Sequence, residues 1–280
     1  AYPLIDQVGE IVVATTRPET MLGDVAIAVN PTDERYKHLI GTKAHLPIVD
    51  REIPIIADDY VDKNYGTGAV KITPAHDPND FEIGKRHNLK PIQVIGFDGT
   101  MINVPQHYMG LDIETARKRV LTDLEIEELR RGESEIEHTV GYDYKSGLPI
   151  QPMIKDQWFI KVKPLAKRAI EILERGEINF TPEHKRSVFI EYLKNLRDWN
   201  ISRQIPWGIP IPAFVNKEDP TDWIFDTRVD QKTLSINGKT YLREEDTFDT
   251  WFSSEQWPYI TTDALEQDNA NKTVCSALLK

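Results

Sequence analysis

Apolar and polar residues alternate in short runs through the first half of the chain. In Val70-Lys71-Ile72-Thr73 the period is two, which places Lys71 and Thr73 on one face of a strand and Val70 and Ile72 on the other. Similar β-rich runs indicate further strands. The predicted strands lie near 10–16, 25–29, 53–56, 69–73 and 92–96.

Helical periodicity dominates later in the chain. The pattern predicts helices near 79–87, 113–131, 163–175 and 182–198. The last of these carries an apolar face that indicates core packing, made of Val188, Phe189, Tyr192, Leu193 and Leu196. Large aromatic residues in this half are interpreted as core or inter-segment anchors, namely Trp199, Trp207, Trp223, Trp251 and Trp257.

These elements predict an α+β fold. Residues 1–140 mix short strands, turns and two helices, which is typical of a compact, barrel-like domain of mixed strands with flanking helices. The pattern then changes to longer helices. We therefore expect at least two structural regions in the 280 residues.

One segment, residues 66–80, concentrates polar side chains between glycines and prolines. Asp77 reads as a helix N-cap, Pro78 as the first helical position and Asp80 as part of the first turn. The polar face of the preceding strand and this helix start are expected to converge on one small polar pocket. Helix capping alone explains both aspartates equally well.

A second polar group ends the run 10–16. Thr15, Thr16, Arg17 and Thr20 lie where a strand gives way to a turn, a common place for ligand contacts on a rigid scaffold. The plainer interpretation makes Arg17 part of a surface ion pair and the two adjacent threonines ordinary strand residues.

Together these two segments carry a family resemblance. Thr15-Thr16-Arg17-Pro18-Glu19-Thr20 and the stretch from Gly66 to Asp80, with its Ala-His-Asp-Pro-Asn-Asp run, resemble the editing domain of class I aminoacyl-tRNA synthetases. Within that family the stretch is most similar to the valyl type, because isoleucyl relatives typically carry His where Lys71 stands. The match rests on two long motifs in the expected order.

The resemblance covers about nine tenths of the chain. Segments 152–159, 197–204 and 249–254 are similar to the return connection and to stretches of the synthetase body. The resemblance implies an editing domain over 1–140, a return connection with a helix over 141–183, and a partial segment of the catalytic body over 184–280. The chain therefore looks like an internal piece of a longer enzyme.

The resemblance also implies an activity. An editing domain of the valyl type hydrolyses threonine mischarged on valine tRNA at the aminoacyl ester, so the expected partners are the 3′ acceptor end of that tRNA, a threonyl ester and the rest of the synthetase. Asp80 is implied as the acid that holds the substrate's α-ammonium. Lys71 and Thr73 join it as the catalytic group, and Asp77 joins them in reading the threonine hydroxyl. Substrate-binding positions are implied at Thr15, Thr16, Arg17, Thr20, His76 and Asp77.

Two other functions stay open at this stage. The chain could act only as a module that binds or spaces the tRNA acceptor end, or as an isoleucyl-type editor that removes valine. His76 as a general base competes with a purely structural role in the turn. No Ser-His-Asp order suggests a nucleophilic esterase instead.

Composition limits the remaining possibilities. The formal net charge of −11 argues against broad, non-specific nucleic-acid binding. No apolar run approaches the roughly 18 residues of a membrane span, and we expect a cytoplasmic protein. A single cysteine, Cys275, leaves no Cys-based zinc site, and no metal role is expected. The ATP-binding signatures of class I synthetases are absent from these residues, so amino-acid activation, ATP and Mg²⁺ are expected only of a full-length enzyme.

Overall fold

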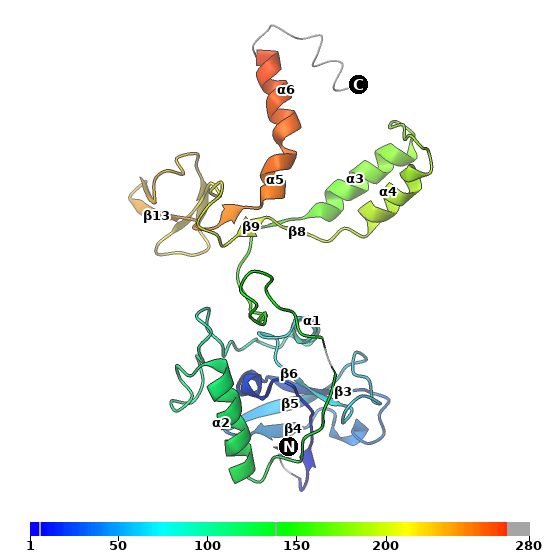
Figure 1. Cartoon of the computed structure of the whole chain (residues 1–280), viewed down its shortest axis with the longest axis vertical. Coiled ribbons are helices and arrows are strands. Elements are labelled where there is room, and N and C mark those ends of the chain that lie inside the picture. Colours follow the sequence, from blue (N-terminus) through cyan, green and yellow to red (C-terminus); the bar gives the residue numbers. More distant parts are fainter. Residues whose placement is uncertain (6, 138, 268–280) are drawn as a thin grey trace. The chain divides into compact units, whose positions relative to one another are not determined.

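The computed structural model describes residues 1–5, 7–137 and 139–267. Cys275 and the rest of the tail lie outside the described residues. The chain forms two compact units, residues 1–155 and 156–280 (Figure 1). The predicted three-part division at 140 and 183 stays a prediction.

A four-stranded mixed sheet organises the first unit. Its strand order is β4-β5-β3-β6, with β3 parallel to β5 and antiparallel to β6. The strands are β3 (Ala26–Val29), β4 (Lys43–Leu46), β5 (Arg51–Ala57) and β6 (Ala69–Ile72). Two further strands, β1 (Tyr2–Pro3) and β2 (Glu10–Ile11), pair with each other.

The predicted mixture of strands and helices is present, but the predicted barrel does not form, because this sheet is open. Its edge strands, β4 and β6, do not pair with each other in the described part of the chain. The β4 edge instead receives an isolated bridge from Leu4 to Ala44. Strand β6 ends at Ile72, and Pro74, two residues further on, has no N–H with which to extend the ladder. The fold of this unit is therefore mixed α/β around an open sheet.

Helices cover the sheet of the first unit. A 3₁₀-helix, η1 (Pro18–Gly23), is followed along the chain by η2 (Lys37–Leu39), α1 (Pro78–Arg86) and α2 (Ile113–Ile126). Ala116, Val120 and Leu124 of α2 pack into the main apolar core with residues of β3 and β5. Burial of this kind, at about 25 cal/mol per Å² of apolar surface, makes the core the main stabilising element of the unit.

The second unit is built from small sheets and helices. Its strands are β7 (Phe159–Ile160), β8 (Trp199–Asn200), β9 (Ser202–Arg203), β10 (Ala213–Asn216), β11 (Trp223–Phe225), β12 (Thr233–Ile236), β13 (Lys239–Arg243) and β14 (Thr247–Phe248). Its helices are α3 (Val162–Glu174), α4 (Lys185–Lys194), α5 (Thr250–Glu255) and α6 (Trp257–Gln267). The largest sheet has the order β11-β10-β13-β12.

Most predicted elements occur, and two predictions need correction. No strand forms at 92–96, where only Ile95 makes an isolated bridge. The reason is that the backbone N–H of Val94 donates to the ring of His76 instead of to a neighbouring strand. The strand expected at 10–16 shortens to β2, which leaves Thr15 and Thr16 outside any strand, and β4 was not predicted.

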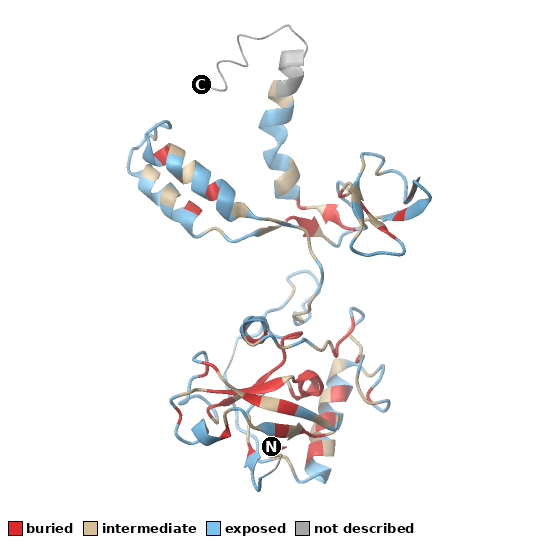
Figure 2. Ribbon diagram, turned by 180° about the vertical axis from the view of Figure 1, so that it is seen from behind, coloured by how far each residue is buried: buried red, intermediate tan, exposed pale blue. Residues whose placement is uncertain are grey.

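The apolar face predicted for α4 is largely exposed. Val188, Phe189 and Tyr192 have exposed fractions of 58%, 42% and 61%, and only Leu193 is buried. Helix α4 packs on α3 through Leu193 and its neighbours (Figure 2). Helix α3 covers one side of α4, and the side that carries Val188, Phe189 and Tyr192 stays largely exposed. Trp207, Trp251 and Trp257 are exposed as well, so the prediction that they act as core anchors is wrong for this structure.

Candidate active site

The predicted polar segment begins where β6 passes into α1. Asp77 caps α1 as expected, because its Oδ1 accepts hydrogen bonds from the backbone N–H groups of Asn79, at 2.8 Å, and Asp80, at 3.1 Å. Asp80 turns inward from the first helical turn, and its Oδ2 accepts from the backbone N–H of Thr73 at 2.8 Å. The carboxylate of Asp80 therefore ties the start of the helix to the end of the strand.

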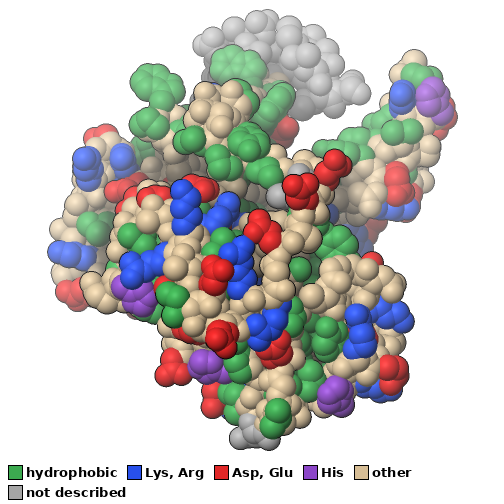
Figure 3. Space-filling view, turned by 60° about the horizontal axis from the view of Figure 1, so that its bottom comes forward, with side chains coloured by type: hydrophobic (Ala, Val, Ile, Leu, Met, Phe, Trp, Pro, Cys, Tyr) green, Lys and Arg blue, Asp and Glu red, His purple; other side chains and the backbone are tan. Residues whose placement is uncertain are grey.

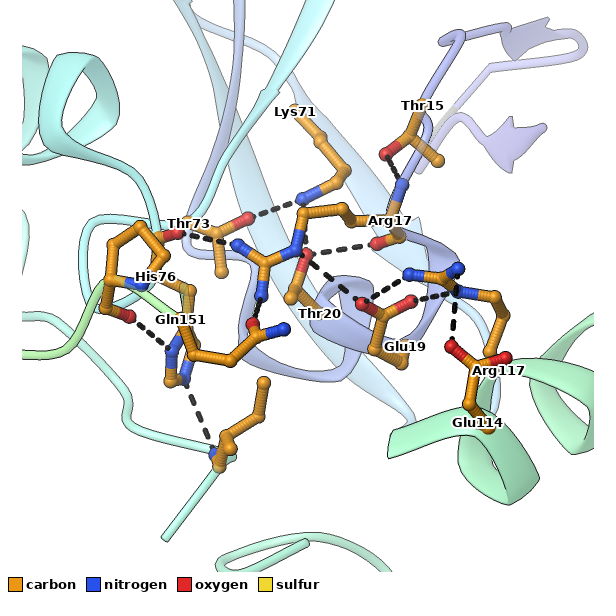
Figure 4. A network of polar contacts seen from close by, with 12 residues as sticks. Thr15, Arg17, Glu19, Thr20, Lys71, Thr73, His76, Glu114, Arg117 and Gln151 are labelled. Atoms are coloured by element: carbon orange, nitrogen blue, oxygen red, sulfur yellow. Dashed lines mark hydrogen bonds and ion pairs between the residues drawn. The ribbon is translucent and has the colours of Figure 1, made fainter. Parts of the chain in front are cut away.

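Lys71 and Thr73 share one face of β6, as their alternation predicts. The Lys71 ammonium donates to Thr73 Oγ1 at 2.5 Å and to Thr20 Oγ1 at 3.0 Å. All three side chains are buried. Residues more than fifty positions apart in the sequence thus form one cluster, which Figure 4 shows.

Asp24 completes this cluster and was not singled out from the sequence. Its Oδ1 lies 3.2 Å from the Lys71 ammonium and accepts the Thr73 hydroxyl at 2.5 Å, while its Oδ2 accepts the Tyr2 hydroxyl at 2.7 Å. Burial raises the pKa of the Asp24 carboxyl, and the Lys71 ammonium opposes this rise. Burial and the neighbouring Asp24 charge raise the pKa of Tyr2 well above its ordinary value. An acid directly before the apolar run 25–29 is the one sequence signal that marks Asp24.

Arg17 lies at the start of η1 and is partly exposed. Its guanidinium donates to the backbone carbonyl of His76 at 2.8 Å, and it also bonds the side-chain oxygen of Gln151. Its Nε lies 3.4 Å from Glu19 Oε1. The guanidinium is therefore held by three groups from separate parts of the first unit.

Glu19 is fully buried and is a second residue that the sequence did not reveal. Arg117 of α2 forms a two-bond ion pair with it, at 2.9 Å from Nε to Oε2 and 3.1 Å from Nη2 to Oε1. A buried carboxylate needs such partners, because its desolvation is otherwise expensive. The pair links η1 to α2 beneath Arg17 (Figure 4).

Both ring nitrogens of His76 are engaged by backbone groups. Nε2 accepts from the N–H of Val94 at 2.9 Å, so the proton lies on Nδ1, which faces the carbonyl of Pro152 at 3.3 Å. Burial lowers the pKa of this histidine to about 4. The ring is therefore neutral and holds the turn in place, which favours its structural interpretation over a general base.

Asp80 keeps one carboxylate oxygen available. Among the described residues, no hydrogen bond reaches its Oδ1, while the side chain as a whole is buried. Burial raises the pKa of Asp80 to about 6; the bond from Thr73 and the Lys71 charge oppose this rise. A cation bound at Oδ1 would favour the charged form of this acid.

The structure brings together most of the predicted site residues but not all of them. The inward-facing group contains Arg17, Thr20, Lys71, Thr73, His76 and Asp80. Thr15 and Thr16 are exposed, and the Thr15 hydroxyl accepts from the backbone N–H of Arg17 at 3.0 Å. Asp77 is exposed too.

A cavity beside α1 has a lining separate from the polar cluster. A cavity of about 190 Å³ lies beside α1 and is lined by Pro74, Phe81, Gly84, Lys85, Asn88, Leu89 and Pro91, none of which belongs to the polar cluster. Within the described ranges, no group of three or more His, Cys, Asp or Glu side chains could hold a metal ion. No helix of the described chain is both long enough and apolar enough to span a membrane.

Comparison with known proteins identifies the class. Residues 59–279 match the family described as "tRNA synthetases class I (I, L, M and V)". The match covers well over half of the sequence, and the chain belongs to this class I synthetase family.

Within this family the chain is similar to valine–tRNA ligases, as its motifs predict. It is 48% identical over 260 residues to that of Clostridium tetani, 51% over 261 residues to that of Geobacillus stearothermophilus, and 47% over 262 residues to that of Bacillus subtilis. Each match covers 93% of this chain and 29% of the relative. The chain thus spans under a third of the length of these enzymes.

Among solved structures, the chain is similar to a LeuRS in a ternary complex with tRNA and LeuAMS from Agrobacterium radiobacter K84. The identity is 17%, the match covers 91% of this chain and 30% of that one, and the TM-score is 0.37.

Proposed function

We propose that the first unit hydrolyses the aminoacyl ester of threonine mischarged on valine tRNA. The observation that carries the proposal is Asp80, a buried carboxylate with one oxygen available, beside a polar cluster of Lys71, Thr73 and Thr20. Family membership and similarity to valine–tRNA ligases support it.

A physical need explains why such a cluster is useful. Valine and threonine have nearly the same shape, and a hydrophobic site cannot strongly reject an isostere that only adds a hydroxyl; valyl enzymes are a known example, with discrimination of about 10². A second site with buried polar groups binds threonine in preference to valine. Valine leaves those groups unpaired there, at a cost of roughly 1–3 kcal/mol each.

The residues divide by what they offer a substrate. Asp80 Oδ1 accepts from the α-ammonium, a charge-assisted contact that fixes the aminoacyl group. Lys71, Thr73 and Asp77 surround the side-chain hydroxyl. Arg17 and Thr20, with Thr15 and Thr16 at the exposed edge, position the ester and the terminal adenosine or orient the attacking water.

The reaction itself is a simple hydrolysis. The oxygen of a water molecule bonds to the ester carbonyl carbon, the bond from that carbon to the ribose oxygen breaks, and the ribose oxygen leaves with a proton. Threonine and uncharged tRNA are the products. His76 holds the turn that carries these groups, because both of its ring nitrogens bond backbone atoms.

The partner we propose is the single-stranded 3′ acceptor end of valine tRNA. The chain's net charge of −11 disfavours contact with many phosphates. On the face shown in Figure 3, Lys and Arg side chains lie among Asp and Glu. A short single-stranded end needs only a local site, and the remainder of a full-length synthetase supplies the other tRNA contacts.

The test is turnover of mischarged threonyl-tRNA by the 280-residue chain and by Asp80→Asn. Hydrolysis by the wild-type chain that Asp80→Asn lacks supports the proposal, whereas equal hydrolysis by both removes the role given to Asp80. Valyl-tRNA serves as the matched substrate and should be hydrolysed far more slowly.

The chain's coverage of 29% of its valine–tRNA ligase relatives favours a second candidate, in which hydrolysis needs the remainder of a synthetase. The chain would then bind or space the acceptor end without hydrolysing the ester. Separate measurements of binding and turnover distinguish the two, because any turnover by the chain alone contradicts the binding-only function.

A further inference from the structure

Every N–H group of the Lys71 ammonium is engaged within the buried cluster. The Lys71 ammonium has three N–H groups. They point at Thr20 Oγ1, Thr73 Oγ1 and Asp24 Oδ1, at 3.0, 2.5 and 3.2 Å. Lys71 therefore has no N–H left for a ligand.

The hydroxyls of Thr73 and Thr20 also donate their protons to groups of the protein. Thr73 donates to Asp24 Oδ1 at 2.5 Å, and Thr20 donates to the carbonyl of Arg17 at 2.9 Å. Each of these oxygens accepts one bond, from Lys71. Because a hydroxyl oxygen has two lone pairs, each keeps one acceptor position.

Asp24 determines the direction in which the Thr73 and Lys71 protons point. It is fully buried, and every described polar partner of its carboxylate donates to it: Thr73 and Lys71 at Oδ1, and Tyr2 at Oδ2. A carboxylate can only accept, so the Thr73 proton cannot turn outward while Asp24 is charged. Each of the groups involved is at least nine-tenths buried, so water cannot readily replace these bonds.

We propose that Asp24 is a positioning residue that orients the Lys71 and Thr73 protons inward, so that the cluster presents only acceptor lone pairs and selects substrates whose side chain donates a hydrogen bond. The inference rests on the proposed function and deepens it. It changes the part played by Lys71, which orders the acceptors instead of donating to the threonine hydroxyl. The substrate class is an amino-acid ester with a β-hydroxyl donor.

A fluorinated analogue tests, in the wild-type chain, whether the substrate's side chain must donate the hydrogen bond. The probes are a hydrolysis-resistant threonyl amide of 3′-amino-3′-deoxyadenosine and its counterpart with fluorine in place of the hydroxyl, which is similar in size but cannot donate. We expect the hydroxyl probe to bind at least about tenfold more tightly, because fluorine leaves the acceptors unpaired. Affinities within threefold of each other, or no binding of the threonyl amide, would overturn the inference.

Variants then test Asp24 itself. In Asp24→Asn the amide can donate, so the Thr73 hydroxyl can turn outward, and the preference for the hydroxyl probe should fall at least threefold. Tyr2→Phe removes one donor from Asp24 and should reduce the preference less. Asp33→Asn is the matched control: Asp33 is a buried aspartate in the same unit that pairs with Arg35, and the preference should not change.

Folding and function stay distinguishable in this design. If Asp24→Asn does not fold, the fluorine comparison in the wild-type chain still decides the inference. Hydrolysis of threonyl-tRNA is measured separately. A chain that prefers the hydroxyl probe but does not hydrolyse the ester contradicts the proposed function alone, whereas a chain that hydrolyses the ester without the preference contradicts the inference alone.

Discussion

The two units differ in the size of the apolar core around their buried polar groups. The first unit buries charged groups such as Glu19, Asp24 and Lys71, each with its partners, within a large apolar core. The second unit leaves Trp207 and Trp251 exposed, and its two apolar clusters contain only three buried residues each. Buried polar groups stay in a fold only when they are fully paired. The first unit is therefore where a specific polar site can be rigid.

Replacing Asp80 in the first unit should have the largest effect, and the property affected is hydrolysis of threonyl-tRNA. Asp80→Asn keeps an oxygen that can accept from Thr73 but removes the charge that we propose binds the α-ammonium. We expect threonyl-tRNA hydrolysis to fall about 100-fold or more, which corresponds to about 2.7 kcal/mol of transition-state stabilisation. Single-turnover hydrolysis measures the loss, and activity within threefold of wild type would contradict it.

The same variant should gain stability at neutral pH. Burial raises the pKa of Asp80 to about 6, from an ordinary 3.8, so the folded state holds a proton that the unfolded chain has lost in this window. The contribution to stability is therefore full below about pH 4, declines as pH rises to about 6 and stays low above it. Chemical denaturation measures this change. Between pH 4 and pH 8, the free energy of unfolding of Asp80→Asn should rise relative to that of the wild type by about 1–2 kcal/mol.

Breaking the buried ion pair between Glu19 and Arg117 should change stability by a similar amount. Glu19→Ala removes a fully buried carboxylate and leaves Arg117 without its two-bond partner. We expect the free energy of unfolding to fall by about 2 kcal/mol, less than for a fully buried pair because Arg117 is partly exposed. The matched control, Glu52→Ala, breaks an exposed pair with Lys43 and should cost under about 1 kcal/mol. Equal losses in both variants would show that burial of Glu19 adds nothing.

Removing the helix cap should have a smaller effect. Asp77→Ala frees two backbone N–H groups at the start of α1 and should cost about 1 kcal/mol of unfolding free energy. Asp112→Ala, at the cap of α2, should cost a similar amount. If Asp77→Ala lowers hydrolysis of threonyl-tRNA much more than Asp112→Ala does, Asp77 acts beyond capping.

The smallest effect is expected in the second unit. Trp207 is 88% exposed, so Trp207→Ser should change the unfolding free energy by less than about 0.5 kcal/mol. A core tryptophan would cost about 3–5 kcal/mol on truncation. Thermal unfolding of the variant therefore decides whether this aromatic residue is a surface residue or a core anchor.

Local patterns in the sequence determined several features of this protein. The alternation around Lys71 placed it with Thr73 on one strand face, and Asp77 with Pro78 marked the start of α1. Both features follow from neighbouring residues, because strand periodicity and helix caps are short-range effects. The two polar motifs also carried the family resemblance.

Only the tertiary structure decided which residues complete the site. Asp24 meets Lys71 across 47 positions, and Glu19 meets Arg117 across 98. The apolar face of α4 looked like core, yet among the described helices it packs on α3 alone. These outcomes depend on which surfaces the folded chain brings together, and neither periodicity nor spacing in a single sequence records that choice, because burial and ion pairing are properties of long-range contacts.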